Sequence, residues 1–304
     1  MIDTIQHVID ALSVGSLYAL VALGIGLLFG ILRLVNFAHG DFITAGAYAL
    51  IVPSTDVTAR LFIGSWAPVL MIPTVCAVVA VLALLTEWSI YRPLRTANAS
   101  TLMIASFSVS YLLQNVMLLV YGSRGKSVDL WSSLDRQIAL GSLRLPVLQL
   151  ITIAVTLSLM AVLTLFLKYT RYGVQMRAAA VDFRMAQYLG VRGNAVIALA
   201  FGISGVLAAV VSMLFLAHSG ALSPTFGVDI GLLGFVAVVI GGLGSLVGAV
   251  IGGFLLGFIE TFLQVYLPAD LRSFQDAFAY GAVILILLIR PMGLIRSRAL
   301  VERV

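Results

Sequence analysis

The interval 168–194, KYTRYGVQMRAAAVDFRMAQYLGVRGN, is the longest polar stretch between the apolar runs of this sequence. It holds a single acid, Asp182, among several bases. The basic side chains are Lys168, Arg171, Arg177, Arg184 and Arg192. We interpret the rest of the sequence relative to this interval.

Apolar residues recur at helical spacing within the interval and predict a short helix with one apolar stripe. The stripe consists of Val174, Ala178, Val181, Met185 and Leu189. Gly190 follows the stripe in the position of a C-cap glycine, so we expect the helix to end there.

Two interpretations of this helix remain open. A basic amphipathic helix between membrane spans can lie on the lipid surface. The small residues of RAAA at 177–180, and the pair Ala186 and Gly190, instead favour a low-profile projection that docks into a groove on a partner protein.

The composition indicates a polytopic membrane protein of the all-α class. Of the 304 residues, 61% are hydrophobic and 10% are charged, and the mean hydropathy is +1.11. A soluble domain of this length could not bury so much apolar side chain. The one cysteine, Cys76, permits no internal disulfide. The net charge of +5 need not indicate nucleic-acid binding, because no basic patch is interleaved with exposed aromatic residues and the arginines lie between spans, where orientation explains them.

The apolar runs predict about eight to nine helical spans, because a membrane helix needs about 20 apolar residues. Two runs, 42–52 and 230–241, have about half that length, and each adjoins a polar or glycine-rich break. The full-length runs are 7–32, 66–90, 101–121, 146–167, 195–217, 246–267 and 274–289. We expect residues 1–304 to form a single transmembrane domain, with 168–194 as its cytoplasmic coupling segment.

The distribution of Lys and Arg predicts the orientation in the membrane. No basic residue precedes Arg33, so we expect the first span to be retained rather than cleaved as a signal peptide. The loops 91–100 and 168–194 and the tail from 290 should be cytoplasmic, with the N-terminus outside and the C-terminus inside. Their bases are Arg92, Arg95, Lys168, Arg171, Arg177, Arg184, Arg192, Arg290, Arg296, Arg298 and Arg303; the opposite loops carry Arg60, Arg124, Lys126, Arg136, Arg144 and Arg272.

Broken helices at corresponding places in two halves point to a translocation pathway, although such runs can also be irregular core helices. Polar residues at membrane depth usually face a cavity or one another. The first break holds Asn36, His39 and Asp41. Asp41 can be the N-cap of the half-length helix that follows, and His39 can donate to a freed carbonyl. Glu260, inside a later span, should face protein or water, so these four residues are the candidate pathway residues.

The second break is rich in glycine. We expect its small-residue stripe to bring two helices close together; a hinge is the alternative. The residues are Gly241, Gly242, Gly244, Gly248 and Gly252. No His or Cys cluster has the spacing of a metal site, so we expect no metal.

Two further motifs suggest enzymes, but their context argues against enzymatic activity. Lys126 lies in GKS at 125–127, yet the glycine that a phosphate-binding loop needs five residues earlier is Val120. Ser204 lies in GISG at 202–205, similar to intramembrane serine proteases, but the nearest histidine we identify, His218, follows the same span. We therefore predict neither an ATP site nor a nucleophile.

Several motifs, taken together, resemble the permease subunits of ATP-binding-cassette importers for branched-chain amino acids. They run from the first span to the last and are most similar to the shorter of the two permeases in such systems. The motifs are LVNFAHGD (34–41), AGAY (45–48), YRPL (91–94), RAAAVD (177–182), LG (189–190), VIGGLGS (239–245) and RPMG (290–293).

The resemblance implies an inner-membrane heterodimer with a homologous second permease, two cytoplasmic ATP-binding subunits and an extracytoplasmic substrate-binding protein. It also implies that 177–190 is the coupling helix gripped by an ATPase subunit, without a cofactor in this chain. The residues expected to couple are Arg177, Ala178, Asp182, Ala186 and Gly190. Such importers often carry Glu-Ala-Ala ahead of the glycine, whereas this chain has Arg184, Met185 and Ala186.

Two alternative functions remain open on the sequence. Urea and short-chain amide permeases share the same motifs. A self-sufficient secondary transporter also uses repeats and broken helices, but it needs a cluster of membrane carboxylates. Asp41, Glu87 and Glu260 are sparse for such a cluster.

Overall fold

The computed structural model describes residues 2–33, 35–54, 56–131, 134, 136–140 and 143–295. Within these residues, seven helices are long and apolar enough to cross a membrane, which confirms the polytopic all-α class. They are α1 (Ile2–Leu32), α3 (Pro68–Thr86, continued by the π-helix η2, Glu87–Tyr91), α4 (Ala99–Tyr121), α5 (Val147–Tyr169), α8 (Gly193–Ser219), α10 (Leu246–Tyr266) and α11 (Gln275–Ile289, preceded by the 3-10 helix η4, Ala269–Phe274).

The two predicted half-length helices are also present. They are α2 (His39–Ala49) and α9 (Phe226–Gly241), and each begins three or four residues earlier than the apolar run suggested. The remaining described elements are short: η1 (Ile63–Ser65), α6 (Arg171–Val181), α7 (Phe183–Tyr188), β1 (Lys126–Ser127), β2 (Gln137–Leu140), β3 (Leu143–Pro146) and β4 (Ala221–Leu222). Of the predicted basic tail, Arg296, Arg298 and Arg303 lie outside the described residues.

The chain divides into two compact units, which we describe separately. Unit 1 comprises Met1–Gly26, Trp131–Leu163 and Leu233–Val304, and unit 2 comprises Leu27–Leu130 and Thr164–Leu232. Three of the divisions fall inside helices, namely α1, α5 and α9, and the fourth falls in the loop between β1 and β2.

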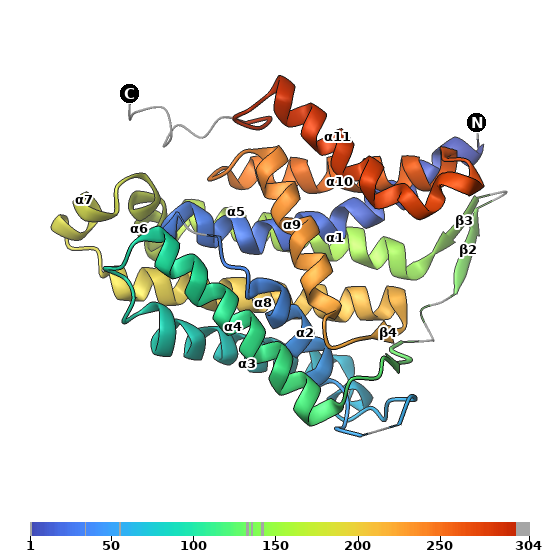
Figure 1. The fold of residues 1–304 in the computed structure, drawn as a ribbon, viewed down its shortest axis with the longest axis horizontal. Helices are drawn as coiled ribbons and strands as arrows, with labels where there is room; N and C mark the ends of the chain where they lie inside the picture. The colour runs from blue at the N-terminus through green and yellow to red at the C-terminus, as the bar shows by residue number, and fades with distance from the viewer. Residues whose placement is uncertain are drawn as a thin grey trace. The chain divides into compact units, whose positions relative to one another are not determined.

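In unit 2, α2 is the central element. It packs against α3, α4 and α8, and α3 packs along α8 (Figure 1). All of α2 from His39 to Tyr48 is buried. Small residues permit these close approaches: a Cβ atom at Gly46 would lie 3.1 Å from Val79 of α3, and one at Gly205 would lie 3.0 Å from Ala80.

One end of unit 2 is closed by short strands and a buried lysine. Strand β1 pairs antiparallel with β4. The ammonium group of Lys126 donates to the carbonyl oxygens of Ser54 at 2.5 Å and Asp56 at 3.1 Å. A lysine that is 3% exposed is stabilised only when its donors are paired. In the GKS sequence, Lys126 is thus bonded to the loop that follows α2.

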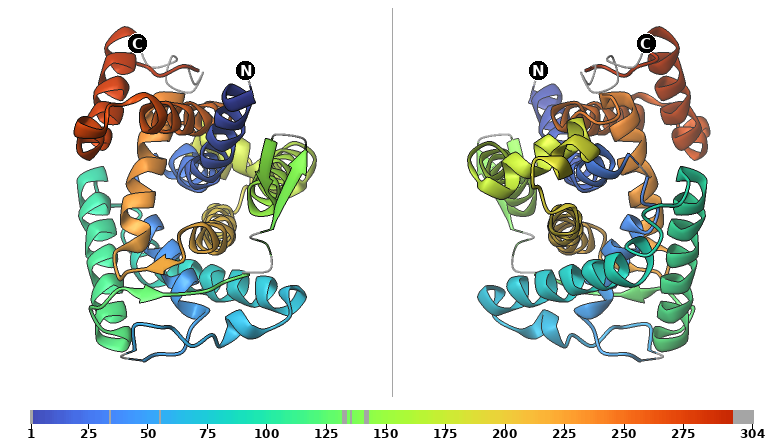
Figure 2. Two further views of the ribbon diagram at one scale, coloured as in Figure 1. Left: turned by 90° about the vertical axis from the view of Figure 1, so that its right-hand side faces the viewer. Right: turned by 90° about the vertical axis from the view of Figure 1, so that its left-hand side faces the viewer.

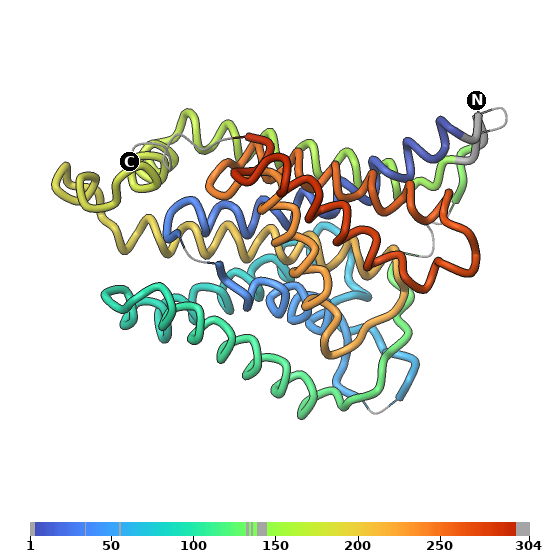
Figure 3. Tube along the Cα trace, turned by 45° about the horizontal axis from the view of Figure 1, so that its top comes forward, coloured from blue at the N-terminus to red at the C-terminus, as the bar shows by residue number. Residues whose placement is uncertain are grey.

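In unit 1, glycines allow α10 to approach two other helices. Added side chains at Gly248 and Gly252 would overlap the α9 backbone, and one at Gly257 would overlap Gly15 of α1. Gly244 does not share this helical face as the sequence suggested: it lies in the preceding turn with φ +86°, and Ser245 is the N-cap of α10. After α11 the chain returns to this region, where the N–H of Leu294 donates to the carbonyl oxygen of Ile240 at 2.9 Å (Figure 3).

The remainder of unit 1 joins α5 to α1. The β2–β3 hairpin stands at one end of α5 (Figure 2). The amide of Gln149 donates to the carboxylate of Asp10 at 3.0 Å, and the hydroxyl of Thr156 donates to the carbonyl oxygen of Ser16 at 3.4 Å. These bonds pair polar groups that would otherwise be left unsatisfied between apolar helices.

Candidate functional site

The break before α2 is organised by Asn36. Its side-chain oxygen accepts a hydrogen bond from the backbone N–H of Ala38 at 3.1 Å and another from the Tyr91 hydroxyl at 2.7 Å. Asn36 is 2% exposed, so both bonds are made inside the protein. The amide thereby replaces helical hydrogen bonds that the broken backbone lacks.

The prediction that Asp41 is the N-cap of α2 is wrong. The N-cap is Ala38, which has helical dihedral angles and no side-chain cap, and Asp41 is the third residue of the helix. The carboxylate still lies in the first turn, where the helix dipole favours negative charge. Its polar neighbours are Ser110 and Gln114 of α4, which hydrogen-bond each other at 3.0 Å.

Four polar atoms of this turn are buried without a hydrogen-bond partner among the described residues. They are Nδ2 of Asn36, Nε2 of His39 and both carboxylate oxygens of Asp41. An unsatisfied buried polar group costs about 1–3 kcal/mol, so such groups are rare and call for an explanation. The Asn36 and His39 nitrogens could therefore bond water or a polar solute, whereas the Asp41 carboxylate has Ser110 and Gln114 as polar neighbours.

His39 does not donate to a freed carbonyl as we expected. Its Nδ1 lies 3.1 Å from the hydroxyl of Ser204 on α8. The view that Ser204 has no histidine on a neighbouring helix is therefore wrong. Ser204 is 0% and His39 1% exposed, and a polar contact between packed helices is the better interpretation of this pair than a catalytic one.

The first turns of the two half-length helices meet inside unit 2. The backbone N–H of Gly227 donates to the hydroxyl of Thr44 at 2.9 Å. A Cβ atom at Gly227 would overlap the carbonyl oxygen of Gly40, and one at Gly231 would lie 2.9 Å from the Gly40 Cα. The positive ends of both helix dipoles are thus close together beside the unpaired polar atoms.

Glu260, the fourth candidate pathway residue, belongs to unit 1. Its carboxylate accepts a hydrogen bond of 2.5 Å from the Tyr18 hydroxyl of α1. The Gln275 amide donates to the Glu260 carbonyl oxygen at 3.4 Å. The residue faces other protein groups, as a carboxylate inside a span must. Asn36, His39 and Asp41 form one cluster, and Glu260 forms a separate pair.

The interval 168–194 forms two helices instead of the single predicted one. Asp182 ends α6 with extended dihedral angles, and its carboxylate then caps α7 by accepting from the Met185 N–H at 3.0 Å. An aspartate in an N-cap stabilises a new helix start, which outweighs continuation of the old one. The expected end at Gly190 is confirmed: φ is +88°, and the Val191 N–H bonds the Ala186 carbonyl at 3.0 Å in a Schellman motif.

The predicted apolar stripe does not face the protein. Buried positions are Gly173, Met176 and Ala179 in α6 and Ala186 in α7. Of the residues expected to couple, Arg177, Ala178, Asp182 and Gly190 are exposed. The exposed large apolar side chains of the interval are Tyr169, Tyr172, Val174, Val181, Met185, Tyr188 and Leu189. Exposed apolar side chains that gather in one segment are candidates for an interaction site.

Three residues of the site were missed from the sequence. Tyr91, Ser204 and Gly227 contact the first break from distant parts of the chain. Tyr91 starts the YRPL motif and Ser204 lies in GISG, but neither motif indicated a contact with the break. In the part of the chain that the structure describes, no group of His, Cys, Asp or Glu could hold a metal ion.

The helical fold and the two half-length helices that meet at a buried polar turn define a polytopic membrane protein of the permease class. The family model described as "Branched-chain amino acid transport system / permease component" matches residues 7–289. The chain belongs to this family, which confirms the resemblance found in the motifs.

Named relatives match along nearly the whole chain. The high-affinity branched-chain amino acid transport system permease protein BraD of Pseudomonas aeruginosa is 34% identical over 308 residues, covering 99% of this chain and 98% of BraD. LivH of Escherichia coli K12, described in the same words, is 34% identical over 309 residues, covering 99% and 97%. A probable LivH of Methanocaldococcus jannaschii is 28% identical over 252 residues, covering 78% and 75%. No solved structure matches the chain.

Proposed function

We propose that this chain is a permease subunit of an ATP-driven importer of branched-chain amino acids. The observation that carries the proposal is the family match over residues 7–289. Identity of 34% along nearly the full length to BraD and LivH supports the same substrate class. Urea or short-chain amides are the alternative substrates, and uptake measurements distinguish them.

The working complex would contain this chain, a homologous second permease, two cytoplasmic ATP-binding subunits and an extracytoplasmic substrate-binding protein. ATP would be hydrolysed by the ATP-binding subunits. The exposed surface of α7 supports docking of one of them, because Met185, Tyr188 and Leu189 form an apolar edge beside Arg184. In this arrangement α6 and α7 belong to the coupling segment 168–194.

The complex would lie in the bacterial inner membrane, with the N-terminus outside and the C-terminus in the cytoplasm. Support comes from the distribution of bases, since most Lys and Arg lie in the loop after η2, in the coupling segment and in the tail. With the coupling segment inside, the end of unit 2 that Lys126 closes would face outward.

The translocation pathway would pass the first turn of α2. An amino acid carries an ammonium and a carboxylate, which need brief polar partners at membrane depth. The unpaired atoms of Asn36, His39 and Asp41 can supply them. We assign Glu260 to the same pathway less directly, through its polarity inside α10 and its bond to Tyr18.

Uptake by the reconstituted five-subunit complex tests the proposed function. Proteoliposomes with ATP inside should accumulate leucine, isoleucine and valine, and should not accumulate urea or acetamide. The control is a complex whose ATP-binding subunits cannot hydrolyse ATP. Accumulation of urea or acetamide instead would assign the chain to the amide permeases, and accumulation without ATP would make it a secondary transporter.

His39→Leu should lower the leucine uptake rate about tenfold, since a hydrogen bond to a charged group contributes about 1.5–3 kcal/mol. Leucine fills similar space but offers no polar atom to a passing substrate. The matched control is His218→Leu at the exposed end of α8, which should keep the rate within about twofold of wild type. Equal rates for the two variants, at equal amounts of complex, would remove His39 from the pathway.

A further inference from the structure

The π-helix η2 joins α3 to the loop that follows it. The N–H of Arg92 donates to the carbonyl oxygen of Glu87 at 2.7 Å, five residues back, where an α-helix would bond four residues back. Such turns are rare and occur mostly at functional sites, because they hold one residue more than the helix needs. In this protein both ends of the turn carry buried polar side chains, Glu87 and Tyr91.

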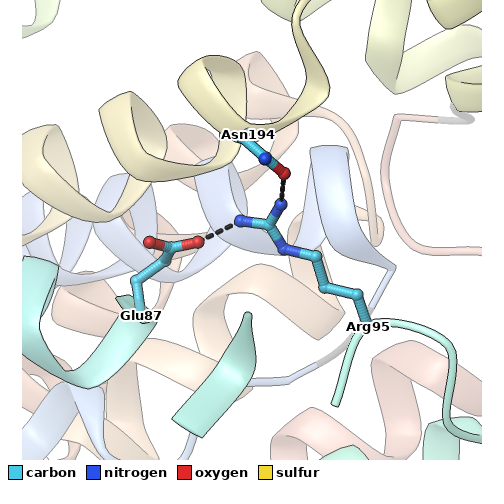
Figure 4. A network of polar contacts seen from close by, with 3 residues as sticks. All are labelled: Glu87, Arg95 and Asn194. Carbon is cyan, nitrogen blue, oxygen red and sulfur yellow. Dashed lines mark hydrogen bonds and ion pairs between the residues drawn. The ribbon is translucent and has the colours of Figure 1, made fainter. Parts of the chain in front are cut away.

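At its first residue, η2 is linked to the coupling segment. The guanidinium of Arg95 donates to the Glu87 carboxylate and to the side-chain oxygen of Asn194 (Figure 4). Glu87 is 4% exposed, so this ion pair is made largely inside the protein. Asn194 is the second residue of α8 and follows Gly190 closely. The three residues therefore fix the point where the coupling segment enters α8.

At its last residue, η2 is linked to the break before α2. Tyr91 is 2% exposed, and its ring packs on Phe201 of α8 with the ring centroids 5.0 Å apart. Its hydroxyl donates to Asn36 at 2.7 Å, and the same oxygen of Asn36 accepts from the N–H of Ala38. Tyr91 thus sets the position of the segment that starts α2.

A second contact joins the same two regions directly. The side chain of Arg33, at the end of α1, donates to the carbonyl oxygen of Val181 at 3.4 Å. Val181 is the last residue of α6, and Arg33 begins the break with φ +55°. Within unit 2, the coupling segment is therefore connected to the break at Val181 as well as through Asn194.

We propose that η2 transmits movement of the coupling segment to the break before α2, with Arg95 and Tyr91 as its positioning residues. The contacts run from Asn194 through Arg95 and Glu87 to Tyr91 and Asn36. The inference rests on the proposed function, since it assumes that an ATPase subunit docks on the exposed surface of α7. Contacts in series show only a physical connection, so the test measures energetic coupling between its two ends.

The test is a double-mutant cycle on the reconstituted complex. We measure leucine transported per ATP hydrolysed for Tyr91→Phe, for Asn194→Ala and for both together. Each single variant should lower the ratio about threefold or more, and the double variant should lower it no further than the worse single one. Independent sites this far apart would multiply their effects.

Two control variants accompany the cycle. Tyr121→Phe removes another hydroxyl of unit 2, which bonds the Tyr48 carbonyl oxygen at 3.1 Å, and it should keep the wild-type ratio. Asn194→Asp keeps an acceptor for Arg95, so it should also keep the wild-type ratio. This variant tests the contact even if Asn194→Ala assembles poorly. Wild-type ratios in both single variants, or multiplied losses in the double variant, would overturn the proposal. Absence of leucine uptake by the wild-type complex would instead contradict the proposed function.

Discussion

Gly227→Ala should destabilise the protein by about 3 kcal/mol or more, at the upper end of the cost of overpacking. The added Cβ would overlap the carbonyl oxygen of Gly40 and lie 2.8 Å from the Thr44 hydroxyl oxygen. Backbone cannot rotate away as a flexible side chain can, so α2 and α9 would have to separate. Their separation would also break the bond from Gly227 to Thr44 and expose α2, which is otherwise buried.

The matched control is Gly30→Ala, another glycine-to-alanine change within a helix. A Cβ atom at Gly30 would meet no atom within 4 Å beyond its own helix backbone. The free energy of unfolding of this variant should therefore rise by about 0.5–1 kcal/mol through the higher helix propensity of alanine. Thermal unfolding of the purified protein in detergent checks both. We expect the melting temperature to fall by about 5 °C or more for Gly227→Ala and to stay level or rise for Gly30→Ala. Equal melting temperatures would show that the two half-length helices do not depend on this contact.

Tyr188→Asp should abolish the stimulation of ATP hydrolysis by the loaded binding protein while leaving the spans folded. Tyr188 and Leu189 are each 85% exposed at the end of α7, and neither contributes to the packing of this chain. In a docked interface an aspartate would bury an unpaired charge, and loss of a central aromatic anchor alone costs about 2 kcal/mol or more. We expect stimulated hydrolysis and uptake to fall more than about tenfold.

Tyr172→Asp is the control, since Tyr172 is a 56% exposed tyrosine of the same segment but belongs to α6. It should retain most of the stimulation, and equal losses in both variants would place the docking surface elsewhere. Substitutions at Ala186 or Gly190 are less suitable. Ala186 is 3% exposed, so a bulky residue there would disrupt α7 itself, and Gly190 has a positive φ that other residues adopt only with strain.

The same surface position reports the orientation of the chain. In a Cys76→Ala background, Tyr188→Cys should react with an impermeant thiol reagent in inverted vesicles and not in intact cells. Arg124→Cys, exposed beside β1, should show the opposite pattern. Labelling of Tyr188→Cys from outside intact cells would reverse the proposed orientation and with it the coupling assignment.

The spans were predictable because each depends on the length of one apolar run. The early start of α9 was not, since the sequence before Ile230 contains Gly227 and Asp229, which are typical of a loop. That segment is helical because it packs on α2, and tertiary packing overrides local propensity. The break at Asp182 was missed for a related reason: the apolar periodicity continues through it, while the N-cap that divides the helix is a single side chain.

The contacts of the site were less predictable than its position. The polar residues at the first break identified the site, but the partner of His39 lies 165 residues away in a sequence that looks like ordinary helix packing. The role of Asp41 depended on a shift of three residues in the start of α2, which sequence patterns do not fix. No sequence signal distinguishes the π-helix from the α-helix that the apolar run predicts.

The π-helix η2 contains one residue more per turn than an α-helix needs, and this extra residue determines how far the chain would move if η2 changed its form. If this turn tightened into regular α-helix, the residues after it would shift in register by one position. One position corresponds to about 100° of rotation and 1.5 Å of rise. Such a rotation would carry the Tyr91 hydroxyl out of reach of Asn36, because a hydrogen bond tolerates only a few tenths of an ångström. A change of one residue in the register of η2 would therefore be enough to break the hydrogen bond between Tyr91 and Asn36.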